Sequence, residues 1–166
     1  AVCRRLGFSQ SALVVMGKKT LDIAGKTVMD LLADDGMNVN HIVANSCNIE
    51  DIVLVEKQID ELKPEVVLGI GGGTKIDVAK MSAAHKEVPF ISVPTTAAHD
   101  GIASPLVSLK GLEKPYSLMA QSPMAIVADT NVIKNSSYRF TASGCADVLS
   151  KLTAVRDWKI AHEVKA

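Results

Sequence analysis

The chain has 166 residues, 48% of them hydrophobic, and its 18 Lys and Arg balance 18 Asp and Glu. That length and composition suffice for one packed core in an ordinary globular domain. A neutral chain without a Lys/Arg block excludes the electrostatic footprint of a nucleic-acid or anionic-membrane partner, and no apolar run approaches the roughly 18 residues of a membrane span.

Strand-like and helix-like patterns alternate through the first 93 residues. Short apolar, β-branched runs predict strands at 11–17, 38–44, 64–70 and 88–93. Helical spacing of apolar residues predicts helices from Thr20 to a stop at Gly36, at 48–62 and at 74–85. This alternation predicts an α/β fold: a Rossmann-like, mostly parallel sheet with helices on both faces.

The pattern changes after residue 105. "LVSL" and "YSLMA" flank "KGLEKP" (110–115), which predicts a hairpin or a β-meander beside the sheet, and "MAIVADT" (124–130) predicts a further strand. From about Tyr138 the pattern is helical. We therefore expect an α/β domain at 1–135 and the first helices of a second, all-helical domain at 136–166.

A glycine turn joins the strand at 64–70 to the next helix, in "VVLGIGGGTKIDVAK". Gly71, Gly72 and Gly73 would let a ligand approach the main chain, and the helix behind them offers free N–H groups to a phosphate. The spacing matches neither the G-x-G-x-x-G fingerprint nor a Walker A loop. A tight turn that merely needs glycines is the alternative. Asp77 lies in the first turn of that helix, where a carboxylate interacts favourably with the helix dipole, or it holds the glycine loop in shape.

The loop "VPTTAAHDGIASP" (93–105) follows the next predicted strand, so it should lie at the same edge of the sheet as the glycine turn. Its hydroxyls and small residues suit a ligand that lies against the backbone. Asp100 precedes a glycine, so it is either a turn-forming residue or a substrate-binding carboxylate, and spacing does not decide between these. His99 is more typical of a hydrogen-bonded loop residue than of a ligand-binding one.

The cysteines and the chain ends give two further expectations. Cys3, Cys47 and Cys145 fit no disulfide framework and no CxxC metal pattern, which favours reduced thiols in a cytoplasmic protein. The chain begins "AVCRRLGF" without Met and finishes in helical period without a Gly or Pro stop. We therefore expect part of a longer protein, in which a site built from two domains is incomplete.

Three segments carry a resemblance to a known family. "GIGGGTKIDVAK", "PFISVPTTAAHDGIASPLVSLKG" and "TASGCADVLSKLTAVRDWKIAH" together resemble the sn-glycerol-1-phosphate dehydrogenases, which make the glycerophosphate backbone of archaeal lipids. These enzymes belong to the dehydroquinate synthase-like superfamily, with glycerol dehydrogenase and the iron-containing alcohol dehydrogenases. The glycine motif is shared across the superfamily, whereas "TTAAHDGIASP" points to the glycerol-1-phosphate branch.

The resemblance implies a function and its residues. The family reduces dihydroxyacetone phosphate to glycerol 1-phosphate with NADH or NADPH and a divalent metal, usually zinc, and it suggests a cytoplasmic homo-oligomer. Asp100 would contact the substrate, and Asp147 would ligate the metal beside it. The residues that would contact the dinucleotide are Gly71, Gly72, Gly73, Thr74, Lys75, Asp77, Thr95, Thr96, Ala97, Ala98 and Ser104.

The metal site is expected to be incomplete in this chain. Catalytic zinc takes three protein ligands, and the family supplies two His from a C-terminal helical domain. Cys145 would face another side of the helix than Asp147, and His162 would lie roughly 22 Å along it. Without the resemblance, Asp147 would be interpreted as an acid near a helix N-terminus. We expect the 166-residue chain to be inactive by itself and to hold zinc weakly.

Two alternatives and one cofactor preference remain. A glycerol dehydrogenase would share the fold, the metal and NAD but accept an unphosphorylated substrate, and a non-catalytic module would only bind the nucleotide. The first strand is followed by Gly17, Lys18 and Lys19, where an acid that disfavours the 2′-phosphate of NADP commonly lies. We therefore predict that NADPH is accepted at least as readily as NADH.

Overall fold

The core of the molecule is a five-stranded sheet in which every strand pair is parallel. The computed structural model describes residues 2–109 and 116–164. The strand order is β2-β1-β3-β4-β7. Its strands are β1 (Ser11–Met16), β2 (Asn38–Val43), β3 (Val66–Gly71), β4 (Phe90–Pro94) and β7 (Ala125–Ile126). The predicted parallel α/β fold is confirmed.

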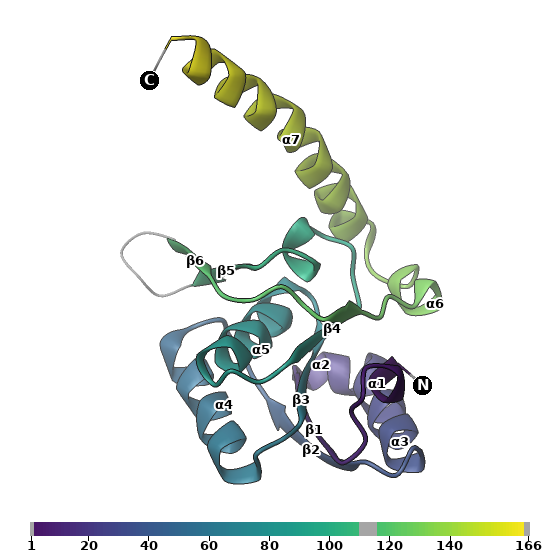
Figure 1. Ribbon diagram of the computed structural model, residues 1–166. Helices are drawn as coiled ribbons and strands as arrows, with labels where there is room; N and C mark the ends of the chain where they lie inside the picture. The colour runs from purple at the N-terminus through teal and green to yellow at the C-terminus, as the bar shows by residue number, and fades with distance from the viewer. Residues whose placement is uncertain (1, 110–115, 165–166) are drawn as a thin grey trace.

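Helices cover both faces of this sheet (Figure 1). The short N-terminal helix α1 and the segment from α2 to α3 lie on one face, and α4 and α5 on the other. Their bounds are α1 (Val2–Arg5), α2 (Lys18–Thr20), the π-helical η1 (Leu21–Gly25), α3 (Lys26–Asp34), α4 (Ile49–Leu62) and α5 (Gly73–His85). The second predicted helix begins after Asn48, whose side chain accepts a hydrogen bond from the Asp51 N–H and caps it.

Two apolar clusters make the core, one on each face. The central strands are buried on both faces, as Leu13 and Val15 of β1 pack toward α4 and α5 while Val14 and Met16 pack toward α3. Continuous apolar runs are the expected sequence of strands in a doubly covered parallel sheet. This burial explains why the strands were recognisable from sequence.

A second, two-stranded sheet lies beside the first. β5 (Leu106–Leu109) and β6 (Tyr116–Met119) pair antiparallel, which confirms the predicted hairpin. Its connecting residues, 110–115, lie outside the described residues. Val107 and Leu109 point into the α4–α5 cluster, so the hairpin extends the core on that face.

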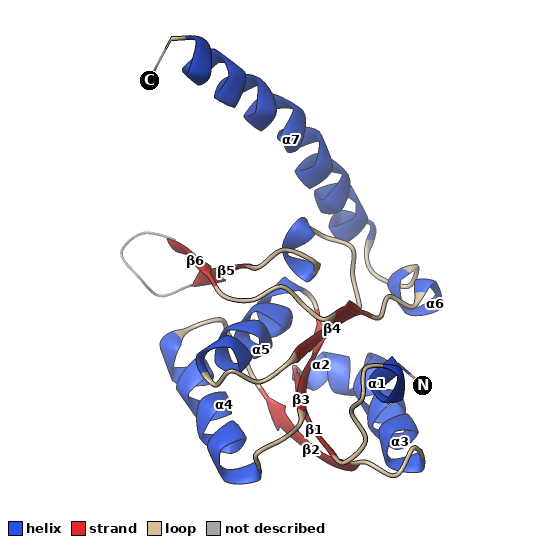
Figure 2. Cartoon of the chain, viewed as in Figure 1, coloured by secondary structure: helices blue, strands red, loops and turns tan. Residues whose placement is uncertain are grey.

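The last segments differ from the sequence expectation in one respect. The strand predicted at 124–130 is only two residues long, because its pairing with β4 covers Ala125 and Ile126 alone. The Asp129 side chain then accepts from the Asn131 N–H and starts the short helix α6 (Thr130–Ile133). A single long helix, α7 (Tyr138–Glu163), follows and extends away from the body (Figure 2). None of the helices formed by the described residues is both long and apolar enough to cross a bilayer.

Candidate active site at the carboxyl edge of the sheet

The glycine turn and the loop after β4 meet at the carboxyl edge of the parallel strands. Gly71 ends β3 with a positive φ of 151°, and its carbonyl accepts a hydrogen bond from the Thr95 N–H at 3.0 Å. Gly72 precedes α5, and a Cβ there would lie 3.5 Å from the Thr96 hydroxyl. The two segments therefore lie side by side, as expected for consecutive strands of a parallel sheet.

A cavity of about 830 Å³ opens at this edge. It is bounded by the segments that follow β1, β2, β3 and β4 and by the first turns of α7. Its lining residues are Gly17, Lys18, Lys19, Thr20, Ile23, Ala44, Asn45, Ser46, Gly72, Gly73, Thr74, Lys75, Thr95, Thr96, Ala98, His99, Arg139, Phe140 and Ser143. Crevices outside the carboxyl ends of parallel strands are the usual ligand sites of such folds.

Seven of the predicted dinucleotide contacts line this cavity, namely Gly72, Gly73, Thr74, Lys75, Thr95, Thr96 and Ala98. The lining does not include Gly71, Asp77, Ala97 or Ser104. The Ser104 N–H instead donates to the Asp100 carbonyl at 3.0 Å. The roles of all these residues in binding a dinucleotide stay predictions.

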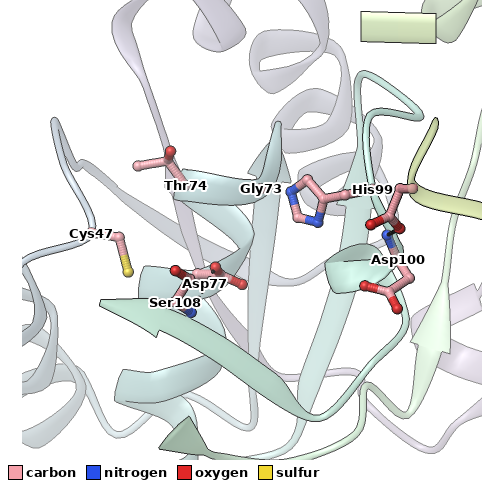
Figure 3. A pocket seen from close by; sticks show the side chains of 8 residues that line it. Cys47, Gly73, Thr74, Asp77, His99, Asp100 and Ser108 are labelled. Atoms are coloured by element: carbon pink, nitrogen blue, oxygen red, sulfur yellow. Dashed lines mark hydrogen bonds between the residues drawn. The ribbon is translucent and has the colours of Figure 1, made fainter. Parts of the chain in front are cut away.

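A smaller cavity of about 390 Å³ adjoins the first (Figure 3). It is lined by Cys47, Gly73, Thr74, Asp77, His99, Asp100, Ser108 and Asp147. Gly73, Thr74 and His99 line both cavities, so the two spaces meet at the N-terminus of α5. The larger cavity has the room for a dinucleotide, and the smaller one for a compact polar molecule next to it.

His99 lies where the two cavities meet. Its Nδ1 accepts a hydrogen bond from the Gly101 N–H at 2.9 Å, so the prediction of a hydrogen-bonded loop histidine is confirmed. In the neutral ring this bond places the proton on Nε2. The ring lies over Gly73 so closely that a Cβ at that position would overlap it.

Asp77 is turned toward the hairpin. Its Oδ2 accepts from the Ser108 N–H at 3.2 Å, and its Oδ1 lies 3.5 Å from the ammonium of Lys80. Burial raises the pKa of the Asp77 carboxyl, against the opposing effects of the Ser108 N–H and the Lys80 charge. Burial likewise lowers the pKa of Lys80. The Asp77 side chain is thus bonded to the hairpin and to Lys80, and a direct contact with a dinucleotide stays a prediction.

Asp100 and Asp147 are brought together. The Asp100 N–H donates to Asp147 Oδ2 at 2.9 Å. Lys151 bridges the two carboxylates, with its ammonium 2.8 Å from Asp100 Oδ2 and 3.8 Å from Asp147 Oδ1. The predicted substrate-binding and metal-ligating carboxylates are therefore neighbours at one side of the smaller cavity.

The close approach of α7 to the loop requires a glycine. A Cβ on Gly144 would overlap the backbone carbonyl of Ala97. This contact, together with the Asp100–Asp147 hydrogen bond, holds the first half of α7 against the site. Phe140 and Arg139 thereby reach the larger cavity.

The described residues do not form a complete metal site. No three or more His, Cys, Asp or Glu side chains in the described part of the chain are grouped so that they could hold an ion. Because α7 is one helix from Tyr138 to Glu163, Cys145 and His162 are held apart from Asp147 as the helical spacing predicts. Asp147 by itself offers one carboxylate.

Sequence reasoning missed Lys80, Lys151 and Arg139. Lys80 lies on the same helix face as Asp77, three residues later, and that spacing was the available signal. Lys151 stands in the same relation to Asp147, four residues later. No local sequence pattern predicts that Arg139 lines the larger cavity, because its position depends on how α7 packs against the loop after β4.

Comparison with known proteins agrees with this architecture. The family model for iron-containing alcohol dehydrogenases matches residues 1–136. Curated glycerol-1-phosphate dehydrogenases [NAD(P)+] are similar to the chain. That of Methanothermobacter thermautotrophicus is 45% identical over 163 residues and that of Methanococcoides burtonii 44% over 164. These alignments cover 98% and 99% of this chain but 46% of each relative, so the chain spans about half of their length.

Solved structures show the same fold. Glycerol dehydrogenase from Schizosaccharomyces pombe superposes with a TM-score of 0.81 at 29% identity, over 87% of this chain and 38% of that one. An iron-containing alcohol dehydrogenase from Thermotoga maritima superposes with a TM-score of 0.77 over 90% of this chain and 49% of that one; at 20% identity it supports the fold alone. The match of the family model over most of the sequence shows that the chain belongs to the iron-containing alcohol dehydrogenase family.

Proposed function

We propose that this chain is the dinucleotide-binding part of an NAD(P)H-dependent enzyme that reduces dihydroxyacetone phosphate to sn-glycerol 1-phosphate, the backbone of archaeal membrane lipids. The observation that carries the proposal is the pair of adjoining cavities at the carboxyl edge of the sheet, which meet at Gly73, Thr74 and His99. The names of relatives at 44–45% identity support the substrate. The α/β domain would comprise residues 1–135, and α7 would begin a helical domain at 136–166.

The residues of the larger cavity fit a pyridine dinucleotide. Gly72 and Gly73 stand at the start of a 13-residue helix, whose free N–H groups and dipole favour a pyrophosphate. Thr95 and Thr96 supply hydroxyls along the same wall. When bound there, the reduced nicotinamide supplies the hydride. The chain's own part is to hold the dinucleotide so that its reactive end reaches the smaller cavity beside His99.

The smaller cavity suits a polar substrate. Asp100 would bind a substrate hydroxyl through its carboxylate, while its backbone N–H keeps Asp147 in place. The second carboxylate, on Asp147, lies in the same cavity lining.

A metal does not enter the steps that we assign to this chain. Catalytic zinc normally has three protein ligands, whereas no three His, Cys, Asp or Glu side chains of the described residues are grouped so that they could hold an ion. Asp147 as a ligand of a divalent ion remains part of the proposal for the whole protein, together with the cytoplasmic homo-oligomer that the family suggests.

The cofactor proposal concerns the rim after β1. Lys18 and Lys19 line the larger cavity, and no Asp or Glu is among its lining residues. Cationic side chains at such a position accommodate the 2′-phosphate of NADP. We propose that kcat/KM with NADPH equals or exceeds that with NADH, and a strong preference for NADH would contradict this.

A glycerol dehydrogenase is the second candidate, favoured by the structural similarity to the enzyme from Schizosaccharomyces pombe. The two candidates differ in the substrate that the full-length protein oxidises. Turnover of glycerol 1-phosphate but not of glycerol supports the first, and the reverse result supports the second. Binding of dinucleotide without any turnover by the full-length protein would leave a non-catalytic module.

Dinucleotide binding can be tested on the chain itself. We expect NADH fluorescence titrations to show binding, and Gly73→Ala to weaken it by about tenfold, or 1.4 kcal/mol, because the new Cβ displaces His99 from the junction of the cavities. Gly7→Ala is the control for general destabilisation, because Gly7 has a positive φ of 89°, at which alanine is strained, yet it lies in neither cavity lining. Failure of the unaltered chain to bind NADH or NADPH would overturn the proposal.

A further inference from the structure

Lys80 is among the largest side chains without exposed surface in the described part of the molecule. It lies in the middle of α5, on the face that looks toward the loop after β4 and the hairpin. A lysine is almost never fully buried unless its charge is paired and hydrogen-bonded. Its position therefore calls for an explanation that packing alone does not give.

The ammonium of Lys80 is bonded to the loop on two sides. It donates to the Gly101 carbonyl at 2.7 Å and to the Leu106 carbonyl at 2.8 Å. Its third donor faces the Asp77 carboxylate at 3.5 Å. An ammonium has three N–H donors, so these partners use all of them. The two carbonyls bracket the end of the loop, from Gly101 to the first residue of β5.

Asp77 extends the same connection into the hairpin. While one of its oxygens faces Lys80, the other accepts from the Ser108 N–H at 3.2 Å. The buried pair on α5 thus fixes the chain at three points within eight residues. None of these bonds is between neighbours in sequence, since Lys80 is 21 and 26 residues from its carbonyl partners.

From Gly101 the connection continues to the two cavities. The Gly101 N–H holds the His99 ring through Nδ1, and the Asp100 carbonyl accepts from the N–H groups of Ala103 and Ser104 at 2.8 and 3.0 Å. The Asp100 N–H in turn holds Asp147. Lys80 is not itself a lining residue of either cavity, yet His99 and Asp100, which line the loop side of the smaller cavity, depend on the backbone that it holds.

We propose that Lys80 is a positioning residue for the substrate side of the site: its ammonium holds the Gly101 and Leu106 carbonyls and so fixes His99 and Asp100 beside the dinucleotide. This inference rests on the proposed function for its catalytic consequence, although not for its structural one. A buried ion pair is seldom more stabilising than apolar residues of the same volume. The pair at Asp77 and Lys80 therefore serves the shape of the loop more than the stability of the core.

The experiment compares three variants. Lys80→Met keeps the length of the side chain and removes the ammonium, and Asp77→Asn/Lys80→Met also removes the carboxylate that would otherwise stay buried without its cation. Lys86→Met is the matched control, because Lys86 lies just after the same helix and pairs with Asp60 at the surface. The double variant keeps an oxygen that can accept from Ser108, so it retains the hairpin contact and the fold.

Hydrogen exchange on the chain itself gives the first readout. In the double variant we expect the amides of Gly101, Ala103 and Ser104 to exchange about tenfold faster, while those of β3 keep their protection. In the full-length enzyme carrying Lys80→Met alone, which keeps the predicted dinucleotide contact Asp77, we expect kcat/KM for dihydroxyacetone phosphate to fall by about a hundredfold with NADH affinity changed less than threefold, because misplaced groups beside the substrate cost rate rather than cofactor binding. Lys86→Met should match the unaltered protein in both.

Two results separate this inference from the proposed function. Loop amides that stay as protected in the double variant as in the unaltered chain would overturn the inference, even if the dehydrogenase activity is established. If the unaltered protein binds no dinucleotide, the proposed function fails, and the exchange data alone decide whether Lys80 positions the loop. A uniform loss of protection across β1, β3 and the loop would also contradict the inference, because it would show a role in global stability.

Discussion

The α/β body and the long helix α7 differ in how much of their apolar surface is buried. In the body, the central strands are buried on both faces, and Leu13 and Val15 have no exposed surface. In α7, none of the 26 residues is buried, and large apolar side chains such as Leu152 and Trp158 are 71% and 79% exposed. The body holds its shape by burial, whereas α7 is anchored at one end.

This difference shows which part of the molecule fixes the positions of the residues that line the two cavities. An α-helix of this length extends about 39 Å at 1.5 Å per residue, and most helices in proteins are stabilised by packing of one face. The first half of α7 is fixed by Gly144 against Ala97 and by Asp147 against Asp100. The loop that makes these contacts is itself fixed by α5. The body therefore positions the part of α7 that lines both cavities.

The first prediction measures the contrast directly. Leu13→Ala should lower the free energy of unfolding by about 2–5 kcal/mol, because it leaves a cavity in the centre of the sheet. Leu152→Ala removes the same atoms from an exposed helix face and should change it by less than about 0.5 kcal/mol. Urea denaturation followed by far-UV circular dichroism gives both values, and similar losses in the two variants would refute the comparison.

The second prediction concerns the anchor of α7. Alanine is favoured over glycine inside a helix by about 1 kcal/mol, yet Gly144→Ala places a Cβ on the Ala97 carbonyl, and α7 must shift at a cost of about 1–3 kcal/mol. Because Arg139 and Phe140 line the larger cavity, we expect weaker binding of NADH in fluorescence titrations. Helix content should be kept.

Thr153→Ala is the control for that variant, because Thr153 lies on the same helix with its hydroxyl bonded only to the Ser150 carbonyl. It should leave NADH affinity unchanged. Tighter binding or unchanged binding in Gly144→Ala would show that the contact of α7 with the loop does not shape the cavity.

The contrast between the buried body and the exposed helix also explains which elements could be predicted from the sequence. The central strands and the flanking helices were predictable because buried parallel strands have continuous apolar runs in the sequence. The meeting of the glycine turn with the loop after β4 followed from topology alone. Strand β7 was overestimated because the apolar pattern continues to Ala128, whereas the pairing with β4 ends at Ile126.

The features that the sequence did not predict depend on contacts between residues far apart in the chain. Lys80 would be assigned to the solvent by its charge, and only the carbonyls of Gly101 and Leu106 make its burial possible. The two possible roles of Asp100 remain compatible with the structure, because the residue starts the turn η2 (Asp100–Ile102) and also lines the smaller cavity. Residues that both shape a loop and line a cavity are typical of loops that form functional sites.

The last prediction uses pH to test a contact of the α/β body, at the end of the sheet opposite to the two cavities. Glu65 precedes β3, about 20 Å along the strand from the glycine turn at 3.3 Å per residue. Its Oε2 accepts from the Gln10 and Ser9 N–H groups at 2.8 and 2.9 Å, and these bonds lower the pKa of Glu65 in the folded state.

A lowered folded-state pKa means that the contribution of Glu65 is present above the unfolded pKa and is lost as the pH falls through the folded one. Glu65→Gln should therefore flatten the acid side of the stability profile and speed hydrogen exchange at Ser9 and Gln10 near neutral pH. Helix α7 and the two cavities should not respond, because Glu65 lies in neither lining. Equal exchange at Ser9 and Gln10 in both proteins would show that these two bonds do not hold the edge of the sheet in solution.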